Sequence, residues 1–372
     1  MRKVIVILGI LVLLIIAYFG YLKVIKNGAD TLTKGKALYD VYVENGSVGF
    51  LEIYDIKKDN IKYSDLEISK KEGKTVAEIS EILDDKVYAT VNPLESKLAN
   101  RVEIFENGKV SKELVFPDKG GPTSIINDRD NNKAYVMFKF SPRSINPNGT
   151  PFGIINTKND EIIDTPFYIK GAIQGYDFDD KYIYVNVVDA DMAEYNDVPG
   201  RYILKIDRDN LSTDIVTPNG LDLYGRDLKI NKNGNIYITS NGYFKDSEYI
   251  DEHKLSIYNK DGSLIENVSL EPWCNNIVID NNGIAYISHR DKDKRRDKLG
   301  DRITIFDTNT NQIVGSITGF KGPESLIIKD NYLFVSNTKG KSISIVDTNS
   351  REIIGNIPLS FDPYSISVVK KG

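Results

Sequence analysis

Side chains of the kinds that most often make binding contacts recur along this sequence at intervals of 40 to 53 residues. The series comprises Thr123, Tyr176, Arg226, Asn275, Glu324 and Tyr364, with Trp273 beside Asn275. Tyr, Arg and Trp are enriched at binding hot spots, where large contact area combines with directional hydrogen bonding. This spacing predicts a ring of contact residues, one from each structural repeat. The alternative is that these side chains pair with one another and plug the centre of the fold.

Motifs of catalysis are absent from the sequence. It contains no H-E-x-x-H pair, no phosphate-binding P-loop, no Rossmann glycine pattern and no G-x-S-x-G elbow. Its two histidines, His253 and His289, fall 36 residues apart in segments expected to be long loops. A binding module is therefore expected in preference to an enzyme.

A metal-assisted hydrolase or lactonase is the main enzymatic alternative. Asp227, Asn275 and Glu324 lie at or next to equivalent positions of three successive repeats. Their carboxylate and amide oxygens suit calcium or magnesium at the mouth of a central channel. No other cofactor is expected. The segment 128–132 (DRDNN) also has oxygen ligands at close spacing, but Asp and Asn in such runs are typical of tight turns.

The elements that must position these residues are short strands in a long repeat. One β-branched run recurs with an aromatic residue near its middle, in steps of 47 to 53 residues. The aromatic positions are Tyr88, Tyr135, Tyr184, Tyr237, Tyr286 and Phe334. A second apolar run follows each of these, and Asn, Asp and Gly separate the runs. Four strands in about 48 residues predict the blades of a β-propeller.

Seven blades result when the two ends of the domain share one blade. The repeat starts with three strands, at 38–43, 50–56 and 63–69, and ends with one unpaired innermost strand at 365–369. Pairing this last strand with the first closes the ring and removes two exposed sheet edges. Six blades would leave one copy of each strand unplaced. The expected fold is therefore an all-β, seven-bladed propeller at 37–372, after a short linker at 27–36.

The last two repeats resemble those of YVTN-type propellers. The resemblance rests on the segments 334–337 (FVSN), 344–348 (SIVDT), 353–357 (IIGNI) and 362–366 (DPYSI). The preceding repeat has YISH, IFDT, IVGSI and GPES at the corresponding places, and the similarity fades toward the N-terminus. It implies a non-enzymatic propeller of the cell envelope or surface. It supplies no catalytic residue.

Five consecutive repeats are expected to have a long loop between their second and third strands. These loops span 92–101, 139–151, 189–200, 241–253 and 289–301. In an antiparallel blade they share one face with the start of the innermost strand, so Phe140 and Tyr243 should lie at the rim of the ring of contact residues. Five long loops on one face favour a recognition surface over variable decoration. The alternating charges of the last loop indicate a solvated segment.

The N-terminus has the pattern of a membrane anchor. Residues 4–22 contain no charge, and Arg2, Lys3, Lys23 and Lys26 flank them. As a helix of about 1.5 Å per residue, 19 residues span close to the ~30 Å hydrocarbon core. No small-x-small cleavage site follows, so an uncleaved single-pass anchor at 1–26 is preferred to a removed signal peptide. The propeller is expected on the extracytoplasmic side, where the single cysteine, Cys274, has no internal disulfide partner.

Composition limits the class of partner. The chain is 41% apolar and 27% charged, as in folded proteins. Residues 1–26 hold four basic and no acidic residue, which leaves 44 basic and 53 acidic residues in the remainder. An acidic propeller does not attract nucleic acid. The expected partner is a small ligand or a protein of the envelope bound at the loop face, and a purely structural docking protein is the third alternative.

Overall fold

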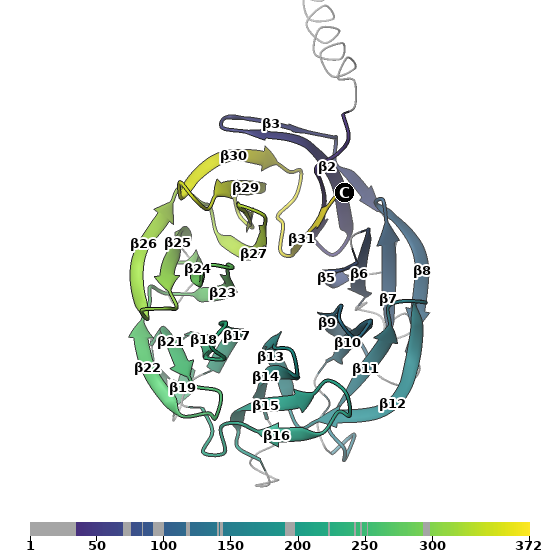
Figure 1. Cartoon of the computed structure of the whole chain (residues 1–372), viewed down its shortest axis with the longest axis vertical. Coiled ribbons are helices and arrows are strands. Elements are labelled where there is room, and N and C mark those ends of the chain that lie inside the picture. Colours follow the sequence, from purple (N-terminus) through teal and green to yellow (C-terminus); the bar gives the residue numbers. More distant parts are fainter. Residues whose placement is uncertain are drawn as a thin grey trace, which may run out of the picture. The chain divides into compact units, whose positions relative to one another are not determined.

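The computed structural model describes residues 35–69, 76–83, 85–91, 100–116, 120–139, 141, 144–189, 198–221, 224–241, 243–245, 248–250, 252–292 and 298–372. Within the unit Leu38–Gly372, seven antiparallel sheets stand around a central axis as the blades of a propeller (Figure 1). The unit before it contributes only residues 35–37 to the description, and these form no helix or strand. The predicted anchor at 4–22 lies outside the described residues, and the described part of the chain contains no helix long and apolar enough to cross a membrane.

Blades 2 to 4 follow one another directly in the chain, each running from the axis outward. Blade 2 consists of β5 (Val76–Leu83), β6 (Lys86–Val91), β7 (Arg101–Glu106) and β8 (Lys109–Val115). Blade 3 consists of β9 (Pro122–Asp128), β10 (Lys133–Phe138), β11 (Thr150–Asn156) and β12 (Glu161–Ile169). Blade 4 consists of β13 (Ala172–Phe178), β14 (Tyr182–Val188), β15 (Arg201–Asp207) and β16 (Thr213–Ile215).

Blades 5 to 7 repeat this order. Blade 5 consists of β17 (Tyr224–Ile230), β18 (Ile236–Asn241), β21 (Lys254–Tyr258) and β22 (Leu264–Ser269), with the hairpin of β19 (Tyr243–Lys245) and β20 (Glu248–Ile250) inserted. Blade 6 consists of β23 (Cys274–Ile279), β24 (Ile284–Asp291), β25 (Leu299–Asp307) and β26 (Gln312–Thr318). Blade 7 consists of β27 (Pro323–Lys329), β28 (Tyr332–Asn337), β29 (Ser342–Asp347) and β30 (Glu352–Pro358).

Blade 1 joins the two ends of the domain and confirms the predicted closure. Its innermost strand is the C-terminal β31 (Ile366–Lys370), which pairs with β1 (Tyr39–Glu44). Next comes β2 (Val48–Lys57), and the outer strand is split into β3 (Asn60–Tyr63) and β4 (Glu67–Ser69). The break between them begins at Ser64, which donates its amide to Glu52 O at 2.8 Å and accepts the Glu52 amide through its hydroxyl at 2.9 Å.

A second contact holds the closure from outside. The turn between β2 and β3 reaches the outermost strand of blade 7, where Asp59 N donates to Ile354 O at 2.8 Å. Lys58 pairs with Glu352 at 2.7 Å beside this bond. Figure 1 shows β3 lying along β30 at this point. Blades 1 and 7 are therefore joined at their outer strands as well as near the axis.

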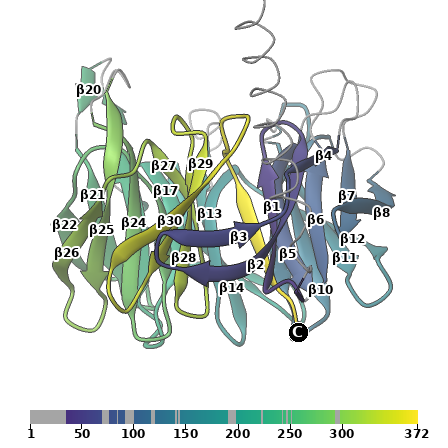
Figure 2. The same cartoon turned by 90° about the horizontal axis from the view of Figure 1, so that it is seen from above.

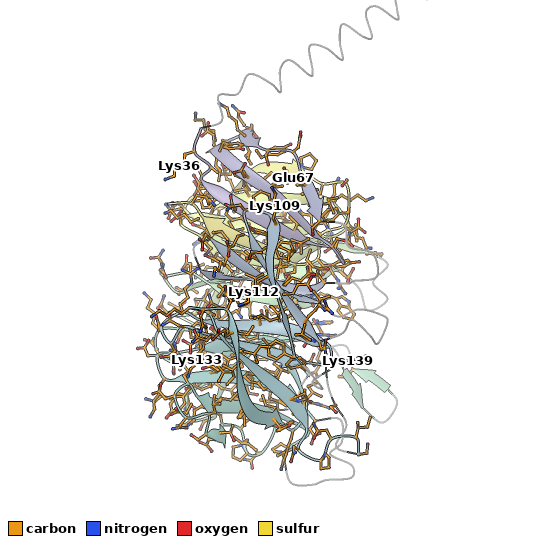
Figure 3. All side chains as sticks on the ribbon, turned by 90° about the vertical axis from the view of Figure 1, so that its right-hand side faces the viewer. Lys36, Glu67, Lys109, Lys112, Lys133 and Lys139 are labelled. Atoms are coloured by element: carbon orange, nitrogen blue, oxygen red, sulfur yellow. The ribbon has the colours of Figure 1, made fainter. Side chains whose placement is uncertain are left out.

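The hydrophobic core lies between neighbouring blades. The second strand of each blade is covered on both faces, so β6 and β14 are apolar and buried almost without interruption. The recurring aromatic residues pack there, and several hydroxyls reach turns: Tyr237 donates to Thr308 O at 3.0 Å and Tyr184 to Asp179 at 3.1 Å. The outermost strands carry polar side chains instead, as Lys109 and Lys112 of β8 show in Figure 3. The alternation of buried second strands and polar outermost strands produces the repeat seen in the sequence.

A buried ion pair joins blades 3 and 4. Arg208, whose side chain is 2% exposed, donates through Nε to Asp128 at 3.0 Å and through a second guanidinium nitrogen to the same carboxylate. It also donates to Asp179 O at 2.7 Å. Asp128 accepts the Asn131 amide at 3.2 Å, which confirms that 128–132 is a turn. The carboxylate that resembled a cation ligand in the sequence is therefore occupied by an arginine.

Candidate functional site

A cavity of about 680 Å³ occupies the axis of the propeller. All seven innermost strands contribute residues to its wall, and the last residue of β1, Glu44, joins them. The innermost strands run from the face that carries β20 toward the face where the chain ends (Figure 2). We call the face that carries β20 the upper face. The second strand of each blade ends on it and the third begins on it, because the strands of each blade alternate in direction.

Five of the seven residues predicted to surround the channel mouth line this cavity. They are Tyr176, Arg226, Asn275, Glu324 and Tyr364. Arg226 is exposed, and the Tyr364 side chain is 44% exposed. Whether these residues contact a ligand stays a prediction.

The other predicted contact residues lie elsewhere or outside the description. Thr123 is half-buried and donates to Met137 O at 3.2 Å, within its own blade. Trp273 is 6% exposed and packs near His253 at a ring separation of 6.3 Å, so its indole belongs to the core below the loops. Phe140 lies outside the described residues, as does the side chain of Tyr243 in β19.

In blade 4 the position equivalent to Arg226 and Asn275 belongs to Gln174. The recurring aromatic residue pairs with a residue of the innermost strand, which is Asp177 in blade 4 and Lys229 in blade 5. The position in question lies three residues before this partner. The sequence predicted Tyr176, two residues farther along the strand. The bulges of β13 and β17 coincide, at Gln174 and Arg226, but the turn after β13 is one residue shorter than the turn after β17, so the spacing from the recurring aromatic residue differs between the two blades. Gln174 is exposed and lines the cavity.

Tyr176 instead belongs to a layer of polar contacts farther down the channel. Its hydroxyl donates to Ile125 O at 2.8 Å and to Glu78 at 3.2 Å, so it reaches from blade 4 past blade 3 to blade 2. Lys229 of blade 5 donates to Tyr176 O at 2.9 Å and pairs with Asp227 at 3.2 Å. These contacts join the innermost strands of blades 2 to 5 across the channel.

The wall of blades 5 to 7 carries a satisfied polar network near the upper face. Asp227 accepts Asn276 Nδ2 at 2.6 Å and the Ile277 amide at 3.1 Å. Glu324 accepts the Asn275 amide group and pairs with Arg290 at 3.2 Å. Each carboxylate on this side therefore already has an N–H donor from a neighbouring strand.

These contacts bear on the alternative of a metal site at Asp227, Asn275 and Glu324. Asp227 accepts four N–H donors in all, including the Leu228 amide and the Lys229 ammonium group. Asn275 turns its amide nitrogen, not its oxygen, toward Glu324. A cation there would have to displace these donors. Within the described ranges, no three His, Cys, Asp or Glu side chains are placed to share a metal ion.

The lower end of the channel is bridged by ion pairs. Lys329, at the end of β27 in blade 7, pairs with Glu81 of blade 2, past the innermost strand of blade 1. Arg129, which follows β9 of blade 3, pairs with the other oxygen of Glu81 at 2.6 Å. Because Lys329 and Glu81 both line the cavity, this bridge narrows the channel on the tight-turn face.

Two cavity carboxyls have raised pKa values. Burial raises the pKa of Glu44 to about 7, although the backbone amides of Gly46 and Ser365 oppose the shift. Burial also raises the pKa of Glu78 to about 7, opposed by hydrogen bonds from Ser124 and Tyr176. Neither glutamate was predicted from the sequence. Glu78 occupies the strand position of Asp227 and Asn276, so the repeat could have revealed it, whereas the short repeat signal of blade 1 hides Glu44.

The two histidines and the cysteine are structural. His289 belongs to β24, not to a loop as expected, because β24 extends to Asp291 and β25 begins at Leu299. Its ring is buried between Pro272 O at 3.1 Å and Thr304 Oγ1 at 2.9 Å, and burial lowers its pKa. His253 is buried before β21. Cys274 is fully buried, and burial raises the pKa of its thiol to about 12.

Comparisons with known proteins identify the fold and nothing finer. No family model matches the chain, and no curated protein matches it. AztD of Citrobacter koseri in its apo form has a TM-score of 0.57 at 12% identity, covering 90% of this chain and 98% of that one. Hydrazine synthase of Kuenenia stuttgartiensis has a TM-score of 0.60 at 12% identity, covering 82% and 97%. A streptogramin B lyase structure has a TM-score of 0.56 at 15% identity, covering 85% and 90%.

Two of these three similar structures carry enzyme names, so the shared fold does not separate binding from catalysis. The likeness agrees with the seven-bladed propeller, and the resemblance to YVTN-type repeats stays a prediction.

Proposed function

We propose that this protein is a binding module that takes a small ligand into its axial channel through the upper face. The observation that carries the proposal is the cavity of about 680 Å³, to which every blade contributes. Its volume falls within the roughly 300–1,000 Å³ range of small-molecule sites. The ion-pair bridge of Lys329, Glu81 and Arg129 narrows the opposite end, which favours access from above.

The wall of this cavity suits recognition better than a passive plug. Three of its residues are exposed: Gln174 of blade 4, Arg226 of the neighbouring blade 5, and Tyr364 in the segment that leads into β31 of blade 1. An arginine offers a planar fork for a carboxylate, and a tyrosine offers contact area at low entropic cost. Below them the network of Glu78, Tyr176 and Lys229 provides a rigid polar floor.

The test is a binding screen followed by substitution on both faces. Fractions of cell-envelope metabolites and proteins are screened by thermal shift and calorimetry, and any ligand found is tested against Arg226→Ala and Tyr364→Ala. Loss of a true hot spot costs about 2 kcal/mol or more of binding free energy. Asn210→Ala and Asp261→Ala on the tight-turn face are the controls. A ligand whose affinity depends on the control residues but not on Arg226 or Tyr364 would refute the proposal.

We further propose that residues 4–22 anchor the protein in a membrane with the propeller on the extracytoplasmic side. The support is the charge-free segment and its basic flanks in the sequence. Such an anchor would present the loop face to envelope proteins or to solutes outside the cytoplasm.

A further inference from the structure

The carboxylates of the cavity differ in how their charge is balanced. Glu81 pairs with Lys329 and Arg129, Asp227 pairs with Lys229, and Glu324 pairs with Arg290. Glu44 and Glu78 also line the cavity, but neither forms an ion pair within the described part of the chain. The partners of Glu44 are backbone amides, and those of Glu78 are hydroxyl groups.

These two glutamates belong to one sector of the channel wall. Glu44 ends β1 in blade 1, and the chain then meets β5 of blade 2 through the Gly46–Val76 bridge. Glu78 follows Val76 by two residues on that innermost strand. Of the basic side chains of the wall, Arg226 and Lys229 come from blade 5, whereas Lys329 of blade 7 reaches blade 2 but is paired with Glu81.

A positive charge placed beside either carboxyl would stabilise its ionised form. Glu44 is 4% exposed and faces no charged side chain from β1, β31 or β5 that shifts its pKa measurably. Glu78 faces Ser124 of β9, Tyr176 of β13, and both Asp227 and Lys229 of β17, whose opposite charges act on its pKa in opposite directions. An enclosed carboxylate without a counter-ion is costly, and a cation within hydrogen-bonding reach recovers part of that cost.

We propose that the ligand of the channel is a small organic cation whose ammonium or guanidinium group binds against Glu44 and Glu78. This inference rests on the proposed function and specifies its ligand class. The cavity volume of about 680 Å³ suits a molecule of several heavy atoms, which distinguishes an organic cation from a bare metal ion. Tyr364 on the neighbouring segment supplies an exposed aromatic face, a surface that attracts cations.

The experiment uses 1,4-diaminobutane as the cationic probe, with 1,4-butanediol as its neutral isostere and succinate as the anionic counterpart. Binding to the full propeller is measured by isothermal calorimetry at pH 8 and at pH 5.5. The variants are Glu44→Gln and Glu78→Gln, which keep the side-chain shape. Glu266→Gln on the exposed outer strand β22 is the matched control.

The diamine should bind at pH 8, and each of the two channel variants should weaken it at least tenfold, whereas Glu266→Gln should leave it unchanged. At pH 5.5 both carboxyls are protonated, because their pKa values lie near 7, so affinity should fall by at least about tenfold. Proton release on binding at pH 7, measured in buffers of different ionisation enthalpy, tests the same point without any variant. It keeps the proposal testable if a variant does not fold.

Equal binding of the diol, no binding of the diamine, or unchanged affinity in both glutamine variants would overturn the cation proposal. Binding of succinate that depends on Arg226 would overturn it while supporting the proposed channel function. If the upper-face substitutions alter the binding of no probe and of no screened ligand, the proposed function itself fails.

Discussion

Glu44 and Glu78 should make the free propeller less stable as the pH rises. Each carboxyl has a pKa near 7 in the folded protein, against an ordinary value of 4.5. The folded state therefore holds more protons than the unfolded state between these two values. Stability from this source is complete below about pH 4.5 and is lost as the pH rises through 7.

The magnitude follows from the size of the shift. At about 1.4 kcal/mol per pKa unit, a shift of this size corresponds to ~3 kcal/mol for one carboxyl. Glu44 is nearly fully buried and should approach that figure, whereas channel water should screen Glu78 and reduce its effect. A glutamine has no proton to lose, so Glu44→Gln should gain up to ~3 kcal/mol relative to the wild type between pH 4.5 and pH 8.

Urea denaturation of the propeller at pH 4.5, 6 and 8 measures this difference directly. Comparison of Glu44→Gln, Glu78→Gln and the exposed control Glu266→Gln separates a local effect from a general change in net charge. Parallel stability curves for the wild type and Glu44→Gln across this range would show that the carboxyl is not desolvated. Glu44 would then not be the unbalanced buried carboxyl that the cation proposal requires.

Three further outcomes test the fold and the anchor. Deletion of residues 365–372 should abolish cooperative thermal unfolding, because β1 loses its partner β31; a deletion variant that melts like the intact protein would contradict closure. Arg208→Ala should lower the unfolding free energy by about 3–5 kcal/mol in chemical denaturation, because it leaves Asp128 charged and buried, and a loss below 1 kcal/mol would mean that water replaces the guanidinium group. The mature protein should fractionate with membranes and keep residue 1 or 2 at its N-terminus, which N-terminal sequencing checks; a soluble form beginning after residue 22 would exclude the uncleaved anchor.

The blade repeat was predictable because each recurring aromatic ring is buried. Tyr237 and Tyr184 bury their rings between blades and bond to a turn through their hydroxyls, and such a requirement repeats at the length of one blade. The closing strand was predictable for a related reason, since an unpaired innermost strand is a row of unsatisfied backbone groups. The sequence therefore revealed the long-range pairing through the strand that each end of the repeat lacks.

The channel was less accessible to sequence reasoning. Tyr176 was predicted in the ring in place of Gln174, because the turns between first and second strands differ in length and the spacing from the aromatic residue does not fix the position. Trp273 was expected at the mouth, but its side chain packs toward His253, a direction that depends on the backbone at a residue with φ of 54°. Glu44 escaped notice because its role depends on blade 2, which lies beside it only in the folded ring.

The pairing of β1 with β31 also constrains the order in which the blades can be completed during folding. These two strands stand at opposite ends of the domain, so β1 has no partner on its inner side until nearly the whole propeller has emerged from the ribosome or the export machinery. Contacts of such sequence separation form slowly, because a very long loop must close first. Until then the inner edge of β1 can recruit a strand from another chain. The inner edge of the first blade therefore stays open to such pairing until the last strand of the domain has been synthesised.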